Sequence, residues 1–406
     1  MVKRVRIGGS LARYEEGFRA RLDELGYASS SAGDQVRLFA DLSGWLAREG
    51  LDAEGLEYEA VDRFLAARRA QGRRTHLTTR ALGPLLVYLQ DLGVAPLGSA
   101  SPPSTAAAQL LETFRRYLAQ ERGLAPGTVR NYVDAARLFI AGLPNPNDPD
   151  LEGLSASEVT GFVLGLARAH ARGGPRSAKN LGTATTGLRS LLGLLFLQGR
   201  IPLPLADAVP SPARWKGSSL PRAVDACTIA ALLDGCDHTR AVGRRDFAIL
   251  TLLVRLGLRA GEVAALLLDD VDWAGGDLLV RGKANRERRL PIPGDVGEAV
   301  VDYLSEGRPR SACRQVFLRA LAPHVEMTPG AVGMVVALAC DRAGLPRMGA
   351  HRLRHTAATE MLRHGAPLSE IGEVLGHARV ETSAIYAKVD RTALSTLAKP
   401  WPGGQS

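Results

Sequence analysis

Apolar residues recur every three to four positions along most of this chain, which is the spacing of amphipathic helices. Proline-rich stretches at 94–105 and 201–221 interrupt the pattern, and such composition is typical of linkers. The first two blocks therefore predict small helical bundles. The third block predicts a larger, mostly helical domain. The domains expected from this pattern are 1–97, 106–205 and 222–398, followed by a short tail over 399–406.

The first two blocks resemble each other. Residues 18–46 align with 115–143 at an offset of 97, which places Gly26 on Gly123. A duplication would explain the match and would make the first block similar to the second. The alternative is that any two small helical bundles share this spacing.

The third block combines helices with a small sheet. Residues 244–266 predict two helices that are interrupted at 256–258. The run D-W-A-G-G-D over 272–277 predicts a turn between short strands. The expected fold class is therefore mainly α with a small antiparallel β-sheet.

Composition describes a soluble globular protein, with 46% hydrophobic and 23% charged residues over 406 positions. The net charge of +9 suits a polyanionic partner. Lys and Arg exceed Asp and Glu by 14 to 13 over 1–100, by 13 to 8 over 101–220 and by 24 to 21 over 221–406. No apolar stretch reaches the ~18 residues of a membrane span, and the N-terminus lacks a signal sequence. We therefore expect a protein of the bacterial cytoplasm with no membrane partner.

The four cysteines, Cys227, Cys236, Cys313 and Cys340, lack the C-x-x-C spacing of many metal sites. A site made by Cys227, Cys236 and His238 is the metal-binding alternative. Free thiols in a reducing cytoplasm are the favoured interpretation. The sequence predicts neither a metal nor a cofactor.

Six residues of the third block have the chemistry to break a DNA phosphodiester without metal: Arg259, Lys283, His351, Arg354, His377 and Tyr386. Arginines can hold phosphate oxygens through paired N–H bonds. A tyrosine can attack phosphorus, a histidine can accept its proton, and a lysine can protonate the leaving oxygen. Any basic protein has spare arginines and histidines, so the order of these residues and their local contexts carry the interpretation.

Those contexts closely resemble the tyrosine recombinase (phage integrase) family. Arg259 lies in GLRAGEVAAL with Glu262 as its usual companion, and Lys283 lies in the hairpin segment DLLVRGKANRERRLPIP. The family's H-x-x-R box matches HRLRHTAATEML, and its last box matches LGHARVETSAIYAKV. The resemblance is strong over about 222–398 and rests on helical pattern alone over about 108–205. It implies helical N-terminal domains, the second of them a core-binding domain, followed by a tyrosine-recombinase-type catalytic domain.

The resemblance also implies an activity. Tyr386 would form a 3′-phosphotyrosyl link, Arg259, Arg354 and His377 would stabilise the phosphate, and His351 and Lys283 would be base and acid. The substrates would be double-stranded recombination sites, bound by a homotetramer that passes through a Holliday junction, and sister recombinases of the same mobile element are further candidate partners. Type IB topoisomerase activity and a non-catalytic DNA-binding regulator on the same scaffold are the alternatives.

Four further expectations concern three single residues and one segment. Thr128 is expected to cap a helix, and Arg130 is expected to point outward from it. His355 is a neighbour of His351 and Arg354 in the sequence, and it is expected to fall on a different helix face and to serve packing. The segment 389–401 predicts a short helix that docks on a neighbouring protomer or on its own catalytic domain.

Overall fold

The structure is a computed structural model that describes residues 7–95, 105–171, 181–211, 223–282 and 286–376. These residues form two compact units. Unit 1 contains the described residues of 1–49 and 216–406, and unit 2 contains those of 50–215. The division falls after Glu49, inside the first expected domain, so the domain boundaries drawn from the sequence stay predictions.

The first helical block provides two helices to each unit. In unit 1, a 3₁₀ turn (Ala12–Tyr14) precedes α1 (Glu15–Glu24) and α2 (Ser29–Glu49), and the Phe18 ring stacks on the Phe39 ring at 5.1 Å. In unit 2, α3 (Tyr58–Ala70) and α4 (Thr79–Asp91) contact each other. Each helix buries the apolar side that its spacing predicts.

The second block forms a helical bundle in unit 2 around one apolar core. The helices α6 and α8 pack closely, and the Phe139 and Phe162 rings meet edge to face at 5.2 Å. The elements are α5 (Ala106–Arg116), a π-helical turn (Tyr117–Glu121), α6 (Pro126–Ala141), α7 (Ala156–Ala171), α8 (Leu181–Leu197) and a 3₁₀ turn (Leu205–Ala208).

The expectation that Thr128 caps a helix was wrong. The helix α6 begins at Pro126, and Ala125 is the capping position, so Thr128 lies inside the first turn. Proline fits this first position because its fixed φ suits a helix and its missing N–H has no partner there anyway. Arg130 is exposed, as expected.

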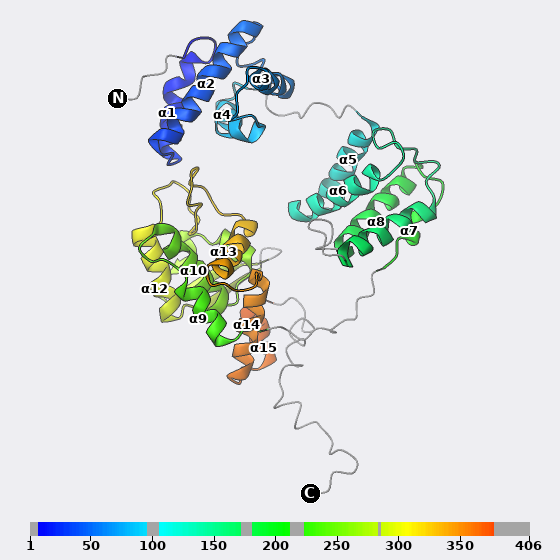
Figure 1. The fold of residues 1–406 in the computed structure, drawn as a ribbon. Helices are drawn as coiled ribbons and strands as arrows, with labels where there is room; N and C mark the ends of the chain where they lie inside the picture. Colours follow the sequence, from blue (N-terminus) through cyan, green and yellow to red (C-terminus); the bar gives the residue numbers. More distant parts are fainter. Residues whose placement is uncertain (1–6, 96–104, 172–180, 212–222, 283–285, 377–406) are drawn as a thin grey trace, which may run out of the picture. The chain divides into compact units, whose positions relative to one another are not determined.

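The third block forms the larger part of unit 1, and α10 lies at its centre. The helix α10 contacts α12, α13 and α14 (Figure 1), and Ala248, Ile249 and Leu253 are fully buried. The helices are α9 (Ala226–Asp234), α10 (Ala241–Arg255), α11 (Ala260–Ala265), α12 (Gly294–Asp302), α13 (Pro329–Arg342), α14 (Ala350–Arg363) and α15 (Leu368–Leu375). The predicted interruption between α10 and α11 is confirmed.

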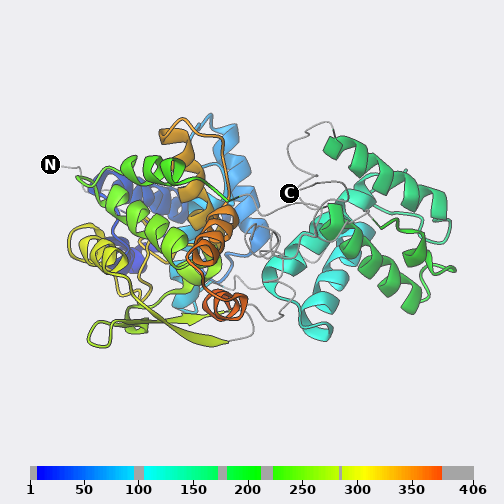
Figure 2. The same cartoon turned by 90° about the horizontal axis from the view of Figure 1, so that it is seen from below.

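A small antiparallel sheet completes this block and runs along one side of its helices (Figure 2). A 3₁₀ turn (Leu268–Asp270) leads into β1 (Val271–Asp272), which pairs with β2 (Asp277–Arg281), and β2 pairs with β3 (Glu287–Pro291). The predicted turn over 272–277 joins β1 to β2. The expected fold class, mainly α with a small antiparallel sheet, is therefore confirmed.

Within the described residues, no helix is long and apolar enough to cross a bilayer. The same residues contain no group of three His, Cys, Asp or Glu side chains that could hold a metal ion. Cys227 is exposed and Cys236 is buried, and both are free thiols.

Candidate active site

The short connection between α10 and α11 positions Arg259. Gly257 has φ +60°, and a Cβ atom there would lie 2.7 Å from Leu375 Cδ2, so glycine alone fits this close approach. Arg259 then occupies the capping position of α11 with an extended backbone. Its backbone N–H donates to Glu262 Oε2 at 2.9 Å, which fixes the start of the helix.

Glu262 is a buried carboxylate that three arginines share. The side chain is 4% exposed. Arg259 Nη1 donates to Oε1 at 2.6 Å, and Arg288 Nη2 donates to Oε2 at 2.9 Å. Arg354 Nη1 lies 4.0 Å from Oε2. One negative charge therefore holds three positive charges together, and the cluster keeps a net positive charge that suits an anionic ligand.

Burial by itself raises the pKa of Glu262, because a desolvated carboxylate is costly. The hydrogen bonds and charges of Arg288 and Arg259 outweigh that effect, so the net pKa lies below its usual value. Glu262 is therefore ionised at neutral pH and acts as a fixed anchor for the arginines.

The same three arginines also hold the end of α15. Arg288 Nε donates to the carbonyl of Val374 at 3.0 Å, Arg354 Nη2 donates to that of Leu375, and Arg259 Nη2 donates to that of Gly376 at 3.2 Å. Carbonyls at a helix C-terminus lack partners within the helix and carry partial negative charge. Three consecutive carbonyls thus each receive one arginine, which ties α15 to α11, β3 and α14.

Arg259 and Arg354 differ in their access to solvent. The Arg354 side chain is 2% exposed, and its Nη1 donates to the Gly257 carbonyl at 2.7 Å. The Arg259 side chain is 41% exposed, so it presents guanidinium N–H groups at the surface of the cluster. The structure therefore brings together the two arginines that the sequence singled out.

Sequence reasoning missed Arg288, which completes the cluster. Its side chain is 13% exposed, and it lies in β3 opposite Val280. Arg288 is two residues before the buried Leu290, so strand alternation puts both side chains on the same face. That alternation was the available signal.

Gly282 and Gly376 both lie against this cluster. A Cβ atom on Gly282 would be 3.6 Å from Glu262 Oε1, and one on Gly376 would be 2.6 Å from Arg288 Nη1. Gly282 directly precedes Lys283, and Gly376 directly precedes His377. The chain thus passes the cluster immediately before two expected site residues. Lys283, His377 and Tyr386, and the expected helix at 389–401, lie outside the described residues.

His351 lies on α14, three residues before Arg354. The residue is exposed, yet the protein around the ring reduces its hydration, and this desolvation lowers its pKa. The positive charges of Arg354 and Arg259 lower the pKa further. A lowered pKa keeps the imidazole neutral at pH 7, and a neutral imidazole can accept a proton.

The expectation that His355 falls on a different helix face from His351 was wrong. The two rings meet edge to face with centroids 4.3 Å apart, because residues four apart share one helix face. Desolvation, followed by the charges of His351 and Arg354, also lowers the pKa of His355. His355 is thus a direct neighbour of His351.

The chain is similar to known proteins over nearly its whole length. Residues 223–392 match the phage integrase family, and residues 111–196 match the N-terminal SAM-like domain of phage integrases. The chain is 40% identical over 399 residues to a putative integrase/recombinase, y4rA, of Sinorhizobium fredii, covering 97% of this chain and 95% of that protein. It is 30% identical to the tyrosine recombinase XerD of Mycobacterium tuberculosis, over 72% of this chain and 96% of the relative.

Two solved structures share the fold at low sequence identity. A lambda integrase dimer bound to a COC′ core site has a TM-score of 0.54 and 17% identity, over 82% of this chain and 87% of that chain. The XerH site-specific recombinase bound to a palindromic difH substrate has a TM-score of 0.52 and 18% identity, over 84% and 94%. These likenesses concern the arrangement of helices and sheet.

Proposed function

The chain belongs to the phage integrase family of site-specific tyrosine recombinases, and from this we propose that it cuts and rejoins DNA through a covalent 3′-phosphotyrosyl link at Tyr386. The observation that carries the proposal is the gathering of Arg259 and Arg354 around Glu262, against the end of α15. Two arginines held at one point, with a neutral histidine on the same helix as one of them, suit the transfer of a phosphoryl group.

The proposed reaction exchanges one phosphoester for another. The Tyr386 oxygen attacks phosphorus, its proton passes to His351, and the bond from phosphorus to the 5′ oxygen breaks. Lys283 gives the departing oxygen its proton, so a free 5′-hydroxyl results. Arg259, Arg354 and His377 hold the non-bridging oxygens, where negative charge grows in the transition state. No nucleotide triphosphate is consumed, because the phosphotyrosyl link stores the bond energy.

The assembly proposed for this reaction is a homotetramer on two synapsed recombination sites, with a Holliday junction as intermediate. One of the solved structures similar to this chain is a lambda integrase tetramer bound to a Holliday junction, and its fold matches at a TM-score of 0.52. We also propose that the protein works at the nucleoid in the bacterial cytoplasm, and that sister recombinases of a mobile element cooperate with it.

Strand exchange between sites is favoured over the two alternatives. The relatives named above are integrases and recombinases, which favours recombination over topoisomerase activity. A non-catalytic regulator would have no need for the full set of six residues, and all six are present in this chain.

We expect Tyr386→Phe to abolish covalent capture of DNA while DNA binding remains. The change removes one hydroxyl and keeps the ring, so the arginine cluster is unaffected. Wild type and variant are expressed separately in a bacterial host, the cells are lysed in denaturant, and DNA that stays attached to the protein is sequenced. Wild type should yield junctions at defined sites, and the variant should yield none.

Attached DNA in the Tyr386→Phe variant would contradict the assignment. Tyr303 is the other tyrosine of the third block, and it makes a poor substitute. Its ring is buried, and its hydroxyl accepts a hydrogen bond from the Leu318 N–H at 3.3 Å. Burial also raises the pKa of Tyr303, which makes it a weaker nucleophile.

A further inference from the structure

The first hundred residues are nearly neutral because an acidic segment and a basic segment offset each other. Residues 1–62 contain 8 Lys and Arg against 12 Asp and Glu, a net charge of −4. Residues 63–100 contain 6 arginines against Asp91 alone, a net charge of +5. A segment with a net charge of +5 favours the approach of a polyanion.

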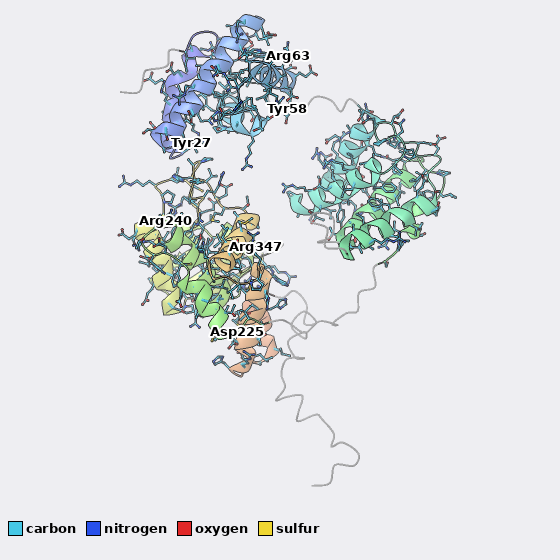
Figure 3. The ribbon with its side chains drawn as sticks, in the orientation of Figure 1. Tyr27, Tyr58, Arg63, Asp225, Arg240 and Arg347 are labelled. Carbon is cyan, nitrogen blue, oxygen red and sulfur yellow. The ribbon has the colours of Figure 1, made fainter. Side chains whose placement is uncertain are left out.

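Four of these arginines surround the junction of α3 and α4 and are exposed: Arg69, Arg73, Arg74 and Arg80. We call them the arginine surface. Figure 3 labels Tyr58 and Arg63 on α3, and the arginine surface begins beyond them, in the last turn of that helix. The junction itself spans only 71–78, so the four arginines come from one compact region.

Hydrogen bonds hold the backbone of this junction in place. Arg69 Nη2 donates to the Leu77 carbonyl at 2.9 Å, and the buried Arg68 donates to the Thr75 carbonyl at 3.4 Å. The Arg68 guanidinium also lies over the Phe64 ring, 5.6 Å from its centroid. Arg68 and Arg69 thus fix the loop that carries Arg73 and Arg74.

Arg80 is placed against the usual electrostatic preference of a helix. It lies in the first turn of α4, where the positive end of the helix dipole favours carboxylates. That turn contains no acidic residue, and the capping residue Thr78 makes no side-chain cap bond. Helix stability therefore does not account for Arg80, whereas an anion bound at this end would interact favourably with both the arginine and the dipole.

The second block has the same arrangement in its sequence. Residues 159–206 contain no Asp or Glu and six Arg and Lys residues, which are Arg168, Arg172, Arg176, Lys179, Arg189 and Arg200. Both blocks therefore concentrate positive charge between their third and fourth helices. The second block is the one that matches the SAM-like domain of phage integrases.

We propose that the arginine surface binds the phosphate backbone of duplex DNA, so that the N-terminal block is a second DNA-contacting module. The choice of DNA as the polyanion rests on the proposed function. Arginine guanidinium groups form paired N–H bonds with phosphate oxygens, and such contacts hold a duplex without reading its sequence. Residues 1–62 have a net charge of −4, so they are poor candidates for contact with phosphate.

The test is the salt dependence of binding by the full-length protein to a mixed-sequence duplex. Each lost phosphate contact lowers the slope of log Kobs against log salt by ~0.9. The triple variant Arg73→Gln, Arg74→Gln, Arg80→Gln leaves Arg68 and Arg69 to hold the junction. We expect its slope to fall by ~2–3 relative to wild type. Fluorescence anisotropy on a labelled duplex gives Kobs at each KCl concentration.

The matched control removes the same charge from the acidic half of the block. Arg21→Gln, Arg37→Gln, Arg48→Gln changes arginines on α1 and α2 and should leave the slope within ~0.5 of wild type, because they make no phosphate contact in this proposal. Equal slopes for the two triple variants would overturn the proposal, since a general loss of charge would then explain the change. An unchanged slope in the junction variant would overturn it as well.

Two further arms separate this proposal from misfolding and from the proposed catalysis. If the junction triple variant melts at a lower temperature than wild type, the double variant Arg74→Gln, Arg80→Gln replaces it, with an expected loss of ~2 in slope. All measurements are repeated in a Tyr386→Phe background. The slope difference should persist there, because binding through the arginine surface needs no covalent step.

Discussion

Glu262 is the residue on which the order of the candidate active site depends. One buried carboxylate receives hydrogen bonds from Arg259 and Arg288 and lies near Arg354. Without it, three guanidinium groups would repel one another in a partly desolvated place. Glu262 thus positions Arg259 and Arg354, the two arginines that we propose act in catalysis.

We expect Arg288→Ala to destabilise the protein and to impair strand cleavage more than DNA binding. Removing one partner of a buried ion pair costs about 3–5 kcal/mol, and the value should lie at the low end because Arg259 remains. Arg289→Ala is the control, since Arg289 is exposed on the other face of β3. Thermal melting and covalent capture are measured for both. Equal behaviour of the two variants would show that Arg288 does not order the cluster.

The lowered pKa of His351 gives a pH prediction. If neutral His351 accepts the Tyr386 proton, single-turnover cleavage should slow as pH falls and His351 becomes protonated, with an inflection below ~6.5. The direction follows from the shift, because a lowered pKa extends the neutral form to more acidic solutions. His351→Asn should cleave slowly and without this inflection. A wild-type rate that is flat down to pH ~5 would make His351 a hydrogen-bond donor and not the base.

At the scale of elements, the end of α15 is what joins the parts of the site. Val374, Leu375 and Gly376 offer three consecutive carbonyls, and arginines from β3, α14 and the start of α11 each take one. Positive side chains are favourable at a helix C-terminus, so this arrangement also stabilises α15. Gly376 directly precedes His377, so the hydrogen bond from Arg259 fixes the point from which the chain continues to His377.

Gly376→Ala tests the contact between the end of α15 and the three arginines. Gly376 has φ +63°, and an added Cβ would lie 2.6 Å from Arg288 Nη1. Gly344 is a matched control with φ +66° and open space around its Cβ position. Gly344→Ala should lose only the ~1–2 kcal/mol of left-handed strain. Gly376→Ala should lose more and should also lose covalent capture. Equal losses of stability and normal capture would mean that Arg288 moves aside freely.

At the scale of the whole molecule, positive charge is concentrated at two corresponding helix junctions. The net charge of +9 indicates that a polyanion is a suitable partner. The net charges of −4 over 1–62 and +5 over 63–100 indicate which part of the N-terminal block is expected to contact it. The arginine surface is therefore the part of the N-terminal block that we propose contacts DNA.

Local sequence determined most of the elements. The apolar spacing of 244–266 and the glycines that follow Trp273 predicted the break after α10 and the β1–β2 turn, because periodicity and turn preference act between near neighbours. Local sequence did not determine the first residue of α6. Pro126 and Thr128 both suit a helix start, and α6 begins at Pro126. The spacing of four between His351 and His355 puts both rings on one helix face, which is the contact that the structure shows.

The motifs by themselves determined the family and the six candidate residues, since those residue types in that order match one known chemistry. Only the tertiary structure decided how Arg259 and Arg354, 95 positions apart, are held together. Their shared partner Glu262, the added Arg288 and the carbonyls of α15 come from separate elements, and no local pattern states that they meet. Burying a carboxylate is favourable only when several donors converge on it, and that convergence exists only once α11, β3, α14 and α15 have packed.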